Sequence, residues 1–514
     1  MGLARKFFTV SGLTVISRVF GVMRESILVH FLGASIEMDA FTTAFKFPGF
    51  FRRFFAEGGF QSIFVPYFTD FTSAKKLKGA GYFSSRIFSL IFWIMLVVTI
   101  LVLIFAKEFT ILMAPGFAKI PEKLALATEF TRIIFPSVAF VSLSTVYSGI
   151  LVSRQKFFPF AMAPILVNLV LVSSLFICQD LLSAGRRISY GVLAAGIFQF
   201  IYMYLCVRIK KLPTPKLSSI KISNRVRAFL KKLAPVLAGA GVAQVNILVG
   251  SFFASFLPTG CITYLYCADR FVQFPLALFG ISMGIVLLPE IAEGLSKKRK
   301  TDLKGIQNRS LLFTLRLTLP SVMGLISLSY WMISLLYGHG KFDQAAVQNT
   351  ADVLKVAAIG LPSFVIAKIM SSVLFAQKDA KTPVTAAIVS IIANIIFSII
   401  LIKPFHELGI AISSSLAGFI NVYVMCRKSK GWFKFEKSVI IDFTKILIAS
   451  FIMLGVILLI DSKIDIDGSK LQELFLVIST CLIGTIVYLV SLFFLKDQAL
   501  KSCISKVRMK FLKR

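Results

Sequence analysis

The chain carries little charge for its length. Of its 514 residues, 16% are charged and 57% are hydrophobic, and the mean hydropathy is +0.84. This composition excludes an ordinary soluble globular protein. Apolar runs of roughly 18 to 28 residues recur from end to end, each long enough to cross a hydrocarbon layer of about 30 Å as a helix. The sequence therefore predicts an all-α polytopic membrane protein with about fourteen transmembrane helices.

Acidic residues are scarce. The chain has 24 Asp and Glu against 57 Lys and Arg, a net charge of +33. The basic residues gather in short connections, such as residues 208–232 with nine bases and no acid, and form no soluble basic module. This excludes a nucleic-acid binder and favours the membrane surface as a partner. Because basic connections stay cytoplasmic, we predict both termini inside; Arg186 and Arg187, in a predicted outer connection, are the exception.

Several kinds of chemical site are missing. The seven cysteines form no Cys-x-x-Cys pair and are interpreted as packing residues. The three histidines, His30, His339 and His406, lie near predicted membrane edges and form no cluster. No Gly-x-x-x-x-Gly-Lys-[Ser/Thr] motif and no nucleophile-and-base arrangement occurs. We therefore predict no enzyme, no metal site and no cofactor.

Two proline-containing motifs recur at nearly equal spacing. "FKFPGFF" around Pro48 is answered by "VQFPLAL" around Pro275, and "SRQKFFPF" with Pro159 by "QKDAKTPV" with Pro383. The offsets, 227 and 224 residues, indicate two copies of a six-helix unit, a common transporter architecture. Chance matches in a biased sequence are the alternative. The predicted domains are an N-terminal lobe (1–210), a basic cytoplasmic linker (211–232), a C-terminal lobe (233–427) and a final helix pair with a basic tail (428–514).

Ionisable residues lie inside the first two apolar runs. They are Arg18, Arg24, Glu25, Asp39, Lys46, Arg52, Arg53 and Glu57. At about 1.5 Å per helical residue, Arg18 lies about 16 Å deep, and Arg270 in a later run lies about 14 Å from the outer face. An isolated arginine at such depth costs at least about 2.5 to 3.5 kcal/mol. These side chains are therefore expected to face a wet or paired interior.

The second run, expected as one helix from Ile36 to Phe68, places most of its charges on one stripe. At 100° per residue, four of them fall within about 40° of each other: Asp39, Lys46, Arg53 and Glu57. Arg52 points away from the stripe unless Pro48 bends the helix. The predicted hinges are Gly21, Pro48, Gly58 and Gly59.

Arginine is an informative residue at such depth. Its planar group binds phosphate oxygens bidentately and keeps its charge when partly desolvated. Three or more arginines in one cavity suit a diphosphate, and depth points to Arg18, Arg52 and Arg270. Structural alternatives remain open. Arg24 and Glu25 could snorkel from the outer end of their helix; Asp39 and Glu57 could only neutralise arginines; Asp269 and Arg270 could form a buried pair that fixes helix register.

Several stretches resemble successive motifs of one family. They are "SRVFGVMRE", "DAFTTAFKFPGFFRRFFAEGGFQSIFVPYF", "APGF", "YCADRFVQFP", "GISMGIVLLPEI" and "KDAKTPV". Over essentially its full length the chain is similar to the MurJ (MviN) family of bacterial lipid II flippases, within the multidrug/oligosaccharidyl-lipid/polysaccharide (MOP) exporter superfamily.

The resemblance implies a fold and a function. The expected fold has fourteen helices, two six-helix lobes around a central cavity and a final helix pair that helps form a groove for the lipid tail. The family moves the undecaprenyl-diphosphate-linked peptidoglycan precursor from the inner to the outer leaflet of the bacterial cytoplasmic membrane for cell-wall synthesis. The implied partners are lipid II, membrane lipids and other cell-wall synthesis proteins.

The resemblance also implies site residues. By motif, it adds Arg24 to the arginines and supports Arg52 beside Arg53. The predicted diphosphate clamp is then Arg18, Arg24, Arg52, Arg53 and Arg270. The predicted cavity charge network is Glu25, Asp39, Lys46, Glu57 and Asp269. Some members have an acidic sodium ligand in the seventh helix, where this chain has Gln244 and Asn246. Sodium coupling is therefore in doubt, and membrane potential or another coupling ion remains a candidate driving force, worth about 2.3 kcal/mol per charge per 100 mV.

Two other functions compete with the flippase. An ion- or proton-coupled exporter of a soluble amphiphile would favour carboxylates over arginines in the cavity. A non-transporting scaffold for cell-wall enzymes would need its basic loops and not its buried arginines.

Overall fold

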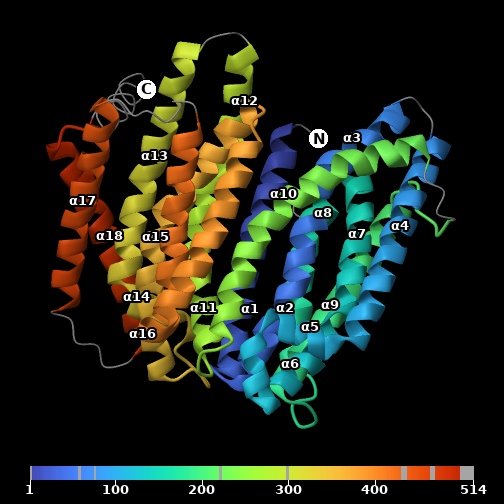
Figure 1. Cartoon of the computed structure of the whole chain (residues 1–514), viewed down its shortest axis with the longest axis horizontal. Coiled ribbons are helices and arrows are strands. Elements are labelled where there is room, and N and C mark those ends of the chain that lie inside the picture. Colours follow the sequence, from blue (N-terminus) through green and yellow to red (C-terminus); the bar gives the residue numbers. More distant parts are fainter. Residues whose placement is uncertain are drawn as a thin grey trace. The chain divides into compact units, whose positions relative to one another are not determined.

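The chain is helical throughout its described part (Figure 1). The structure is a computed structural model that describes residues 3–55, 59–73, 77–218, 223–296, 300–429, 437–462 and 469–497, and no strand occurs among them. The chain divides into two compact units. Met1–Thr263 with His339–Asp343 form the first unit, and Tyr264–Gly338 with Gln344–Arg514 form the second. The predicted all-α class is confirmed.

The first unit contains the helices up to the start of α11. They are α1 (Leu3–Leu32), α2 (Ile36–Phe55), α3 (Gly59–Ser73), α4 (Leu77–Ile104), α5 (Ala106–Met113), the 3₁₀ turn η1 (Pro115–Lys119), α6 (Pro121–Ile134), α7 (Pro136–Ser153), α8 (Phe157–Phe176), α9 (Ala184–Ile209), α10 (Asn224–Ala254) and α11 (Cys261–Pro275). Within the unit α1 packs on α8, α2 on α6, and α7 on α9. Helix α10 contacts α3 and α4 near one end and η1 near the other (Figure 1).

Aromatic residues hold α3, α4 and α10 together. Phe60, Phe64 and Phe68 recur every four residues, so they share one face of α3, and all three are fully buried. Phe83 of α4 and Phe229 of α10 join them, with ring centroids 5.7 Å apart. Burying a phenylalanine contributes about 1.5 to 3 kcal/mol. This cluster therefore fixes the end of the unit where α3 ends and α4 and α10 begin, which we call the basic end.

The second unit contains the remaining helices. They are α11 from Tyr264, the π-helical turn η2 (Leu276–Ile281), α12 (Ser282–Ser296), α13 (Lys300–Ser327), α14 (Ser329–Tyr337), α15 (Gln344–Ala376), α16 (Lys381–Lys428), α17 (Lys437–Asp461) and α18 (Lys470–Phe494). Element α16 is two helices joined at His406, whose backbone is non-helical with φ 48°. Ten helical stretches within the described residues, some of them made of two or three consecutive elements, are long and apolar enough to cross a membrane.

The final helix pair is fixed to its unit at both ends. Near one end Arg316 of α13 forms an ion pair with Asp497 at 2.8 Å, and Asp497 is fully buried. Near the other, Trp331 Nε1 donates to Asp461 Oδ1 at 2.6 Å, and Ser334 Oγ donates to Glu473 Oε1 at 3.1 Å. Helices α17 and α18 are therefore an integral part of the second unit.

The duplication is visible in the helix boundaries. Six pairs of helices start 223 to 225 residues apart: α2 and α11, α3 and α12, α4 and α13, α5 and α14, α6 and α15, and α8 and α16. Such agreement along the chain supports the predicted duplication over chance matches between short motifs.

Two equivalent loops contact the ends of helices in the first unit. Gly116 N, after α5, donates to Ser255 Oγ at the end of α10 at 2.9 Å. Lys341 N, after α14, donates to His30 O at the end of α1 at 3.0 Å. A Cβ on Gly116 would lie 2.1 Å from Ser255 O, and one on Gly340 would lie 2.5 Å from His30 O. Both contacts therefore require glycine.

Two sequence-based boundaries can be set beside the described elements. The run from Ile36 to Phe68, expected as one helix, is described as α2 up to Phe55 and as α3 from Gly59. Helix α10, whose residues from 233 on are predicted to lie in the C-terminal lobe, lies in the compact unit that contains Met1–Thr263. The division into lobes and linker stays a prediction.

Candidate functional site

The face of α1 that meets α8 is built around one asparagine. Ser17, Gly21 and Arg24 are spaced by four and three residues, so they share this face. Asn168 of α8 donates to Ser17 O at 3.3 Å and accepts from Arg24 Nη1 at 3.0 Å. A Cβ on Gly21 would lie 3.7 Å from Asn168 Nδ2. Helix α1 is unbroken there, and the glycine lies directly against the amide; the hinge at Gly21 stays a prediction.

Arg24 lies in the interior of the unit. Its guanidinium forms an ion pair with Glu25, and the two side chains are 14% and 5% exposed. It also lies 5.9 Å from the centre of the Phe45 ring on α2. Snorkelling is therefore not the role of this pair, because both side chains are held by protein groups. Arg18, six residues earlier on α1, is exposed.

Lys46 links α2 to α10. Its ammonium group donates to Ser251 Oγ, and Ser251 is buried while Lys46 is half-buried. Part of the Lys46 residue is therefore exposed beside this contact. The cationic side chains described on α1 and α2 are thus Arg18, Arg24 and Lys46.

Asp39 has a different role from the predicted one. It is fully buried and forms an ion pair with Lys123 of α6 at 2.7 Å, and Lys123 is 1% exposed. Its carboxylate also accepts from Gly260 N at 2.9 Å, from Thr263 N at 3.0 Å and from Thr263 Oγ1 at 2.7 Å. It therefore caps the first turn of α11, where free N–H groups favour an anion. The partners of Asp39 given by the structure are thus a lysine and the start of α11, and its place in a cavity charge network stays a prediction.

Arg270 and Asp269 lie on α11 within the second unit. The Arg270 guanidinium stacks 4.4 Å from the centre of the Tyr266 ring one turn earlier. Asp269 is exposed and accepts from Gln273 Nε2 at 2.8 Å. The alternative of a buried Asp269–Arg270 pair is therefore wrong.

Several predicted residues cannot be placed in full. Arg52 and Arg53 lie on α2, but the structure does not describe their side chains. Glu57 and Gly58 lie outside the described residues. Gly59 is the first residue of α3. Pro48 lies inside α2, which continues to Phe55.

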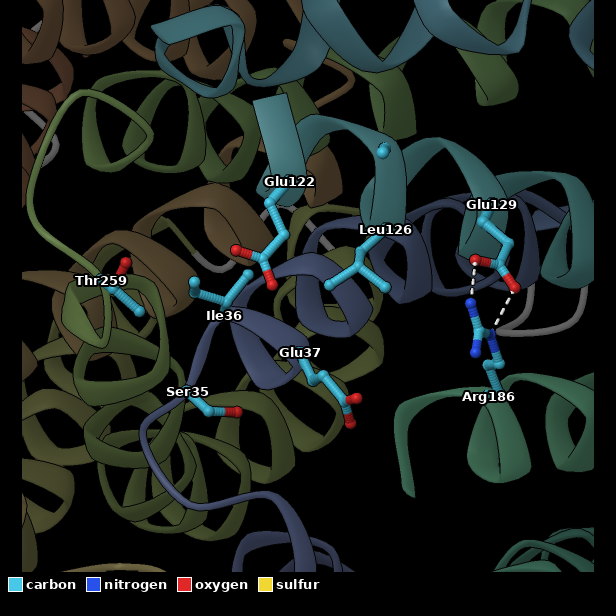
Figure 2. A pocket seen from close by; sticks show the side chains of 9 residues that line it. Ser35, Ile36, Glu37, Glu122, Leu126, Glu129, Arg186 and Thr259 are labelled. Carbon is cyan, nitrogen blue, oxygen red and sulfur yellow. Dashed lines mark hydrogen bonds and ion pairs between the residues drawn. The ribbon is translucent and has the colours of Figure 1, made fainter. Parts of the chain in front are cut away.

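A pocket of about 650 Å³ opens in the first unit at the end opposite the basic end. It is lined by Ser35, Ile36, Glu37, Glu122, Ala125, Leu126, Glu129, Arg186 and Thr259. Figure 2 shows the Arg186–Glu129 pair at one side and Ser35 with Thr259 at the other. Arg186 Nε and Nη2 reach the two Glu129 oxygens at 2.7 and 3.1 Å. Sequence reasoning missed this pocket because its acids come from two segments far apart in the sequence, Glu37 on α2 and Glu122 with Glu129 on α6.

Arg186 and Arg187, the exception to the predicted orientation, both make contacts within the first unit. Arg186 is paired with Glu129, and Arg187 is buried and donates to Leu175 O at 2.6 Å. A cation near the last carbonyls of α8 is stabilised by the helix dipole. Their charge is therefore compensated locally at the start of α9.

In the described part of the chain no group of three or more His, Cys, Asp or Glu residues is arranged so that it could hold a metal ion. Asn246 of α10 is half-buried, and the Gln244 side chain is outside the described ones. What the site offers is hydrogen-bonding cations, which suit an anionic ligand.

The duplicated frame of long apolar helices, with ionisable side chains on α1, α2 and α11, defines a multi-pass membrane transporter. A solved inward-facing multidrug-resistance MATE transporter of the MOP superfamily shares this fold, with a TM-score of 0.66, 13% identity, and coverage of 85% of this chain and 98% of that one. The model of the family described as "Lipid II flippase MurJ" matches residues 28–499. The chain belongs to the MurJ family.

Relatives support this assignment along nearly the whole length. The "Probable lipid II flippase MurJ" of Rhizobium tropici is 35% identical over 472 residues, covering 90% of this chain and 88% of its own. A solved structure described as "Lipid II flippase MurJ, inward closed conformation" has a TM-score of 0.79 and 30% identity, covering 94% of this chain and 99% of its own. The predicted family and the MOP-type fold are thereby confirmed, whereas the count of fourteen spans stays a prediction.

Proposed function

We propose that this chain is a lipid II flippase that carries the undecaprenyl-diphosphate-linked peptidoglycan precursor to the outer leaflet for cell-wall synthesis. The observation that carries the proposal is the family match over residues 28–499. A flippase is a transporter and not an enzyme. The drug-exporter alternative is less well supported, because the multidrug transporter of the same fold is only 13% identical.

The proposed diphosphate clamp keeps the five arginines Arg18, Arg24, Arg52, Arg53 and Arg270. Arg24 is the best supported, because Asn168 and Glu25 orient its guanidinium while 14% of the side chain stays exposed. Lys46, half-buried near Ser251, would add a further cation. Charge-assisted hydrogen bonds to phosphate are about twice as strong as neutral ones. The arginines would hold the headgroup while the tail stays in lipid and the lobes alternate.

The proposed orientation puts the basic end in the cytoplasm. Lys210, Lys211, Lys216, Arg225 and Arg227 gather at that end, whereas Glu37, Glu122 and Glu129 line the pocket at the other. Basic connections are retained on the cytoplasmic side. The protein is then a multi-pass protein of the bacterial cytoplasmic membrane with both termini inside. Membrane potential is the proposed driving force.

The test is lipid II exposure at the outer leaflet. Depleting the protein should stop exposure, and purified protein in vesicles should restore flipping, faster with a potential imposed. Arg18→Ala, Arg24→Ala and Arg270→Ala variants that insert normally should lose most of the flux. Unchanged exposure after depletion, or full flux in all three variants, would sink the proposal.

Conservative variants test the phosphate geometry. Arg24→Lys keeps the charge but removes the planar group, so flux should fall while insertion does not. As a matched control, Lys107→Gln removes an exposed cation of α5 and should leave flux unchanged. Wild-type flux in Arg24→Lys would argue against bidentate binding at that residue.

A further inference from the structure

The segment after α9 is attached to the first unit. The backbone N of Lys216 donates to Ser85 Oγ at 3.0 Å, and that of Ser218 donates to Ser89 Oγ at 2.8 Å. Both serines belong to α4. Earlier in the segment, Pro213 lies 3.8 Å from a Cβ built on Gly81. Residues 211–218, part of the predicted linker, are therefore a surface layer of the unit with a defined position.

The first turns of α10 form an amphipathic helix beside this layer. Val226, Phe229 and Leu233 are 3%, 0% and 6% exposed and recur at helical spacing. Phe229 lies against Tyr67 of α3 with ring centroids 5.8 Å apart. The opposite face carries only basic side chains at its charged positions, all exposed: Arg225, Arg227, Lys231 and Lys232. One face is thus fixed in the protein and the other is cationic.

Aromatic rings hold two of these cations in place. Arg225 lies 4.4 Å from the centre of the Phe71 ring, and Lys232 lies 5.3 Å from the centre of the Tyr67 ring. Phe71 and Tyr67 are one turn apart on α3, and the two cations are two turns apart on α10. A cation over the face of a ring is attracted to it even at an exposed site. The ring contacts therefore fix the positions of these two cations. The cations are also numerous, because residues 211–218 and 223–234 hold six basic and no acidic residues.

Exposed apolar side chains accompany the cations. Tyr82 is 71% exposed, Ile209 72% and Leu217 54%. Tyr82 follows Gly81, which Pro213 approaches, and Leu217 lies between the two residues bonded to α4. An acidic protein or nucleic acid would leave these side chains in water. At a bilayer surface they would enter the acyl boundary while the cations meet the phosphates.

We propose that this surface binds the headgroups of anionic phospholipids. The surface, named the basic shelf, comprises Lys216, Arg225, Arg227, Lys231 and Lys232 with Tyr82, Ile209 and Leu217. Each basic residue near an anionic bilayer contributes about a fivefold gain in affinity. The basic shelf lies outside the proposed diphosphate clamp, so it concerns the bilayer that surrounds the protein and not its cargo.

The experiment uses the full-length protein in mixed micelles of phosphatidylcholine and phosphatidylglycerol. Thermal unfolding is followed as the mole fraction of phosphatidylglycerol rises. The wild-type Tm should rise and saturate. In R227Q/K231Q, which alters two exposed cations outside the ring contacts, half-saturation should need at least about five times more phosphatidylglycerol. The control K107Q/K403Q, with two exposed lysines elsewhere, should respond as wild type.

Two further arms separate lipid from other sources of the effect. Leu217→Gln should also weaken the response, because it removes the apolar contribution and keeps every charge. Inorganic phosphate alone should not raise Tm. Equal responses of R227Q/K231Q and wild type, or an equal rise with phosphate or with phosphatidylcholine alone, would overturn the proposal. Thermal unfolding does not depend on flipping, so this proposal and that of the transport function fail or succeed separately.

Discussion

The α7–α8 and α15–α16 connections occupy equivalent places in the two copies. They have the same backbone conformation but few identical residues. Gln155 and Lys378 both have positive φ, 56° and 63°. In each connection the next residue donates back five positions, Lys156 N to Leu151 O and Asp379 N to Leu374 O, both at 2.9 Å. The duplication has therefore preserved how helices end even where side chains diverged.

The same two copies differ in buried charge. Helix α1 carries Arg18, Arg24 and Glu25 beyond its first turns, whereas α10 carries no charged residue after Lys232. Helix α1 thus holds the Arg24–Glu25 ion pair, whereas the later turns of α10 hold only neutral side chains. The difference indicates that the helical frame can form without these ionisable residues. The charged positions of α1 are therefore candidates for function.

The largest expected effect on stability comes from breaking the Asp39–Lys123 ion pair of the first copy. Asp39→Ala should lower the free energy of unfolding by about 3 to 5 kcal/mol, because it leaves Lys123 buried without its partner. Asp269→Asn in the second copy, at an exposed site, should change it by less than about 0.5 kcal/mol. Chemical unfolding in detergent measures both. Asp39→Asn with Lys123→Met should recover part of the loss, and equal losses for Asp39 and Asp269 would refute the distinction.

The next effect tests whether the two loop contacts are equivalent. Gly116→Ala and Gly340→Ala would each place a Cβ within 2.5 Å of a backbone oxygen. Each should cost about 2 kcal/mol, since backbone atoms must shift, and Tm should fall in both. Gly455→Ala, with open space around its Cβ, serves as control. A loss in only one of the two loops would break the comparison.

A smaller effect concerns transport. Asn168→Leu removes the acceptor for Arg24 Nη1 and the donor to Ser17 O. Losing a buried hydrogen bond costs about 1 to 3 kcal/mol, so flux in vesicles should drop about tenfold. Leu169→Ala, on the exposed side of α8, should keep wild-type flux. If Asn168→Leu also keeps it, the arginine does not depend on the amide.

The smallest effect should appear equally in both copies. Gln155→Gly and Lys378→Gly place glycine where φ is positive. Each should raise the free energy of unfolding by up to about 1 kcal/mol, because the left-handed region carries a penalty for other residues. Alanine at the same positions should give no gain, and thermal unfolding separates the two. A gain at one site only would show that the connections differ after all.

The sequence was sufficient for features that depend on local pattern. Hydrophobic run length predicted the helices, and the spacing of Pro159 and Pro383 predicted the duplication, because each proline lies in the first turn of its helix.

Long-range partners could not be predicted in this way. Asp39 was placed on a stripe of charges by periodicity, yet its partners Lys123, Gly260 and Thr263 come from other segments. Periodicity gives the face of a helix but not the element that meets it. Asn168 had one overlooked signal, since it is the single amide in the apolar helix α8, where an unpaired polar group would be costly.

Segment His339–Asp343 has a consequence for synthesis of the protein. It belongs to the first unit although it follows α14 of the second, and its Lys341 bonds to His30 O at the end of α1. A ribosome delivers α1 long before this segment, and domains generally fold in the order of their synthesis. The first unit therefore has to wait, with the end of α1 uncovered, until α14 has been inserted. A chain arrested before residue 339 should expose that helix end to proteases in the membrane, even though every helix of the first unit is already made.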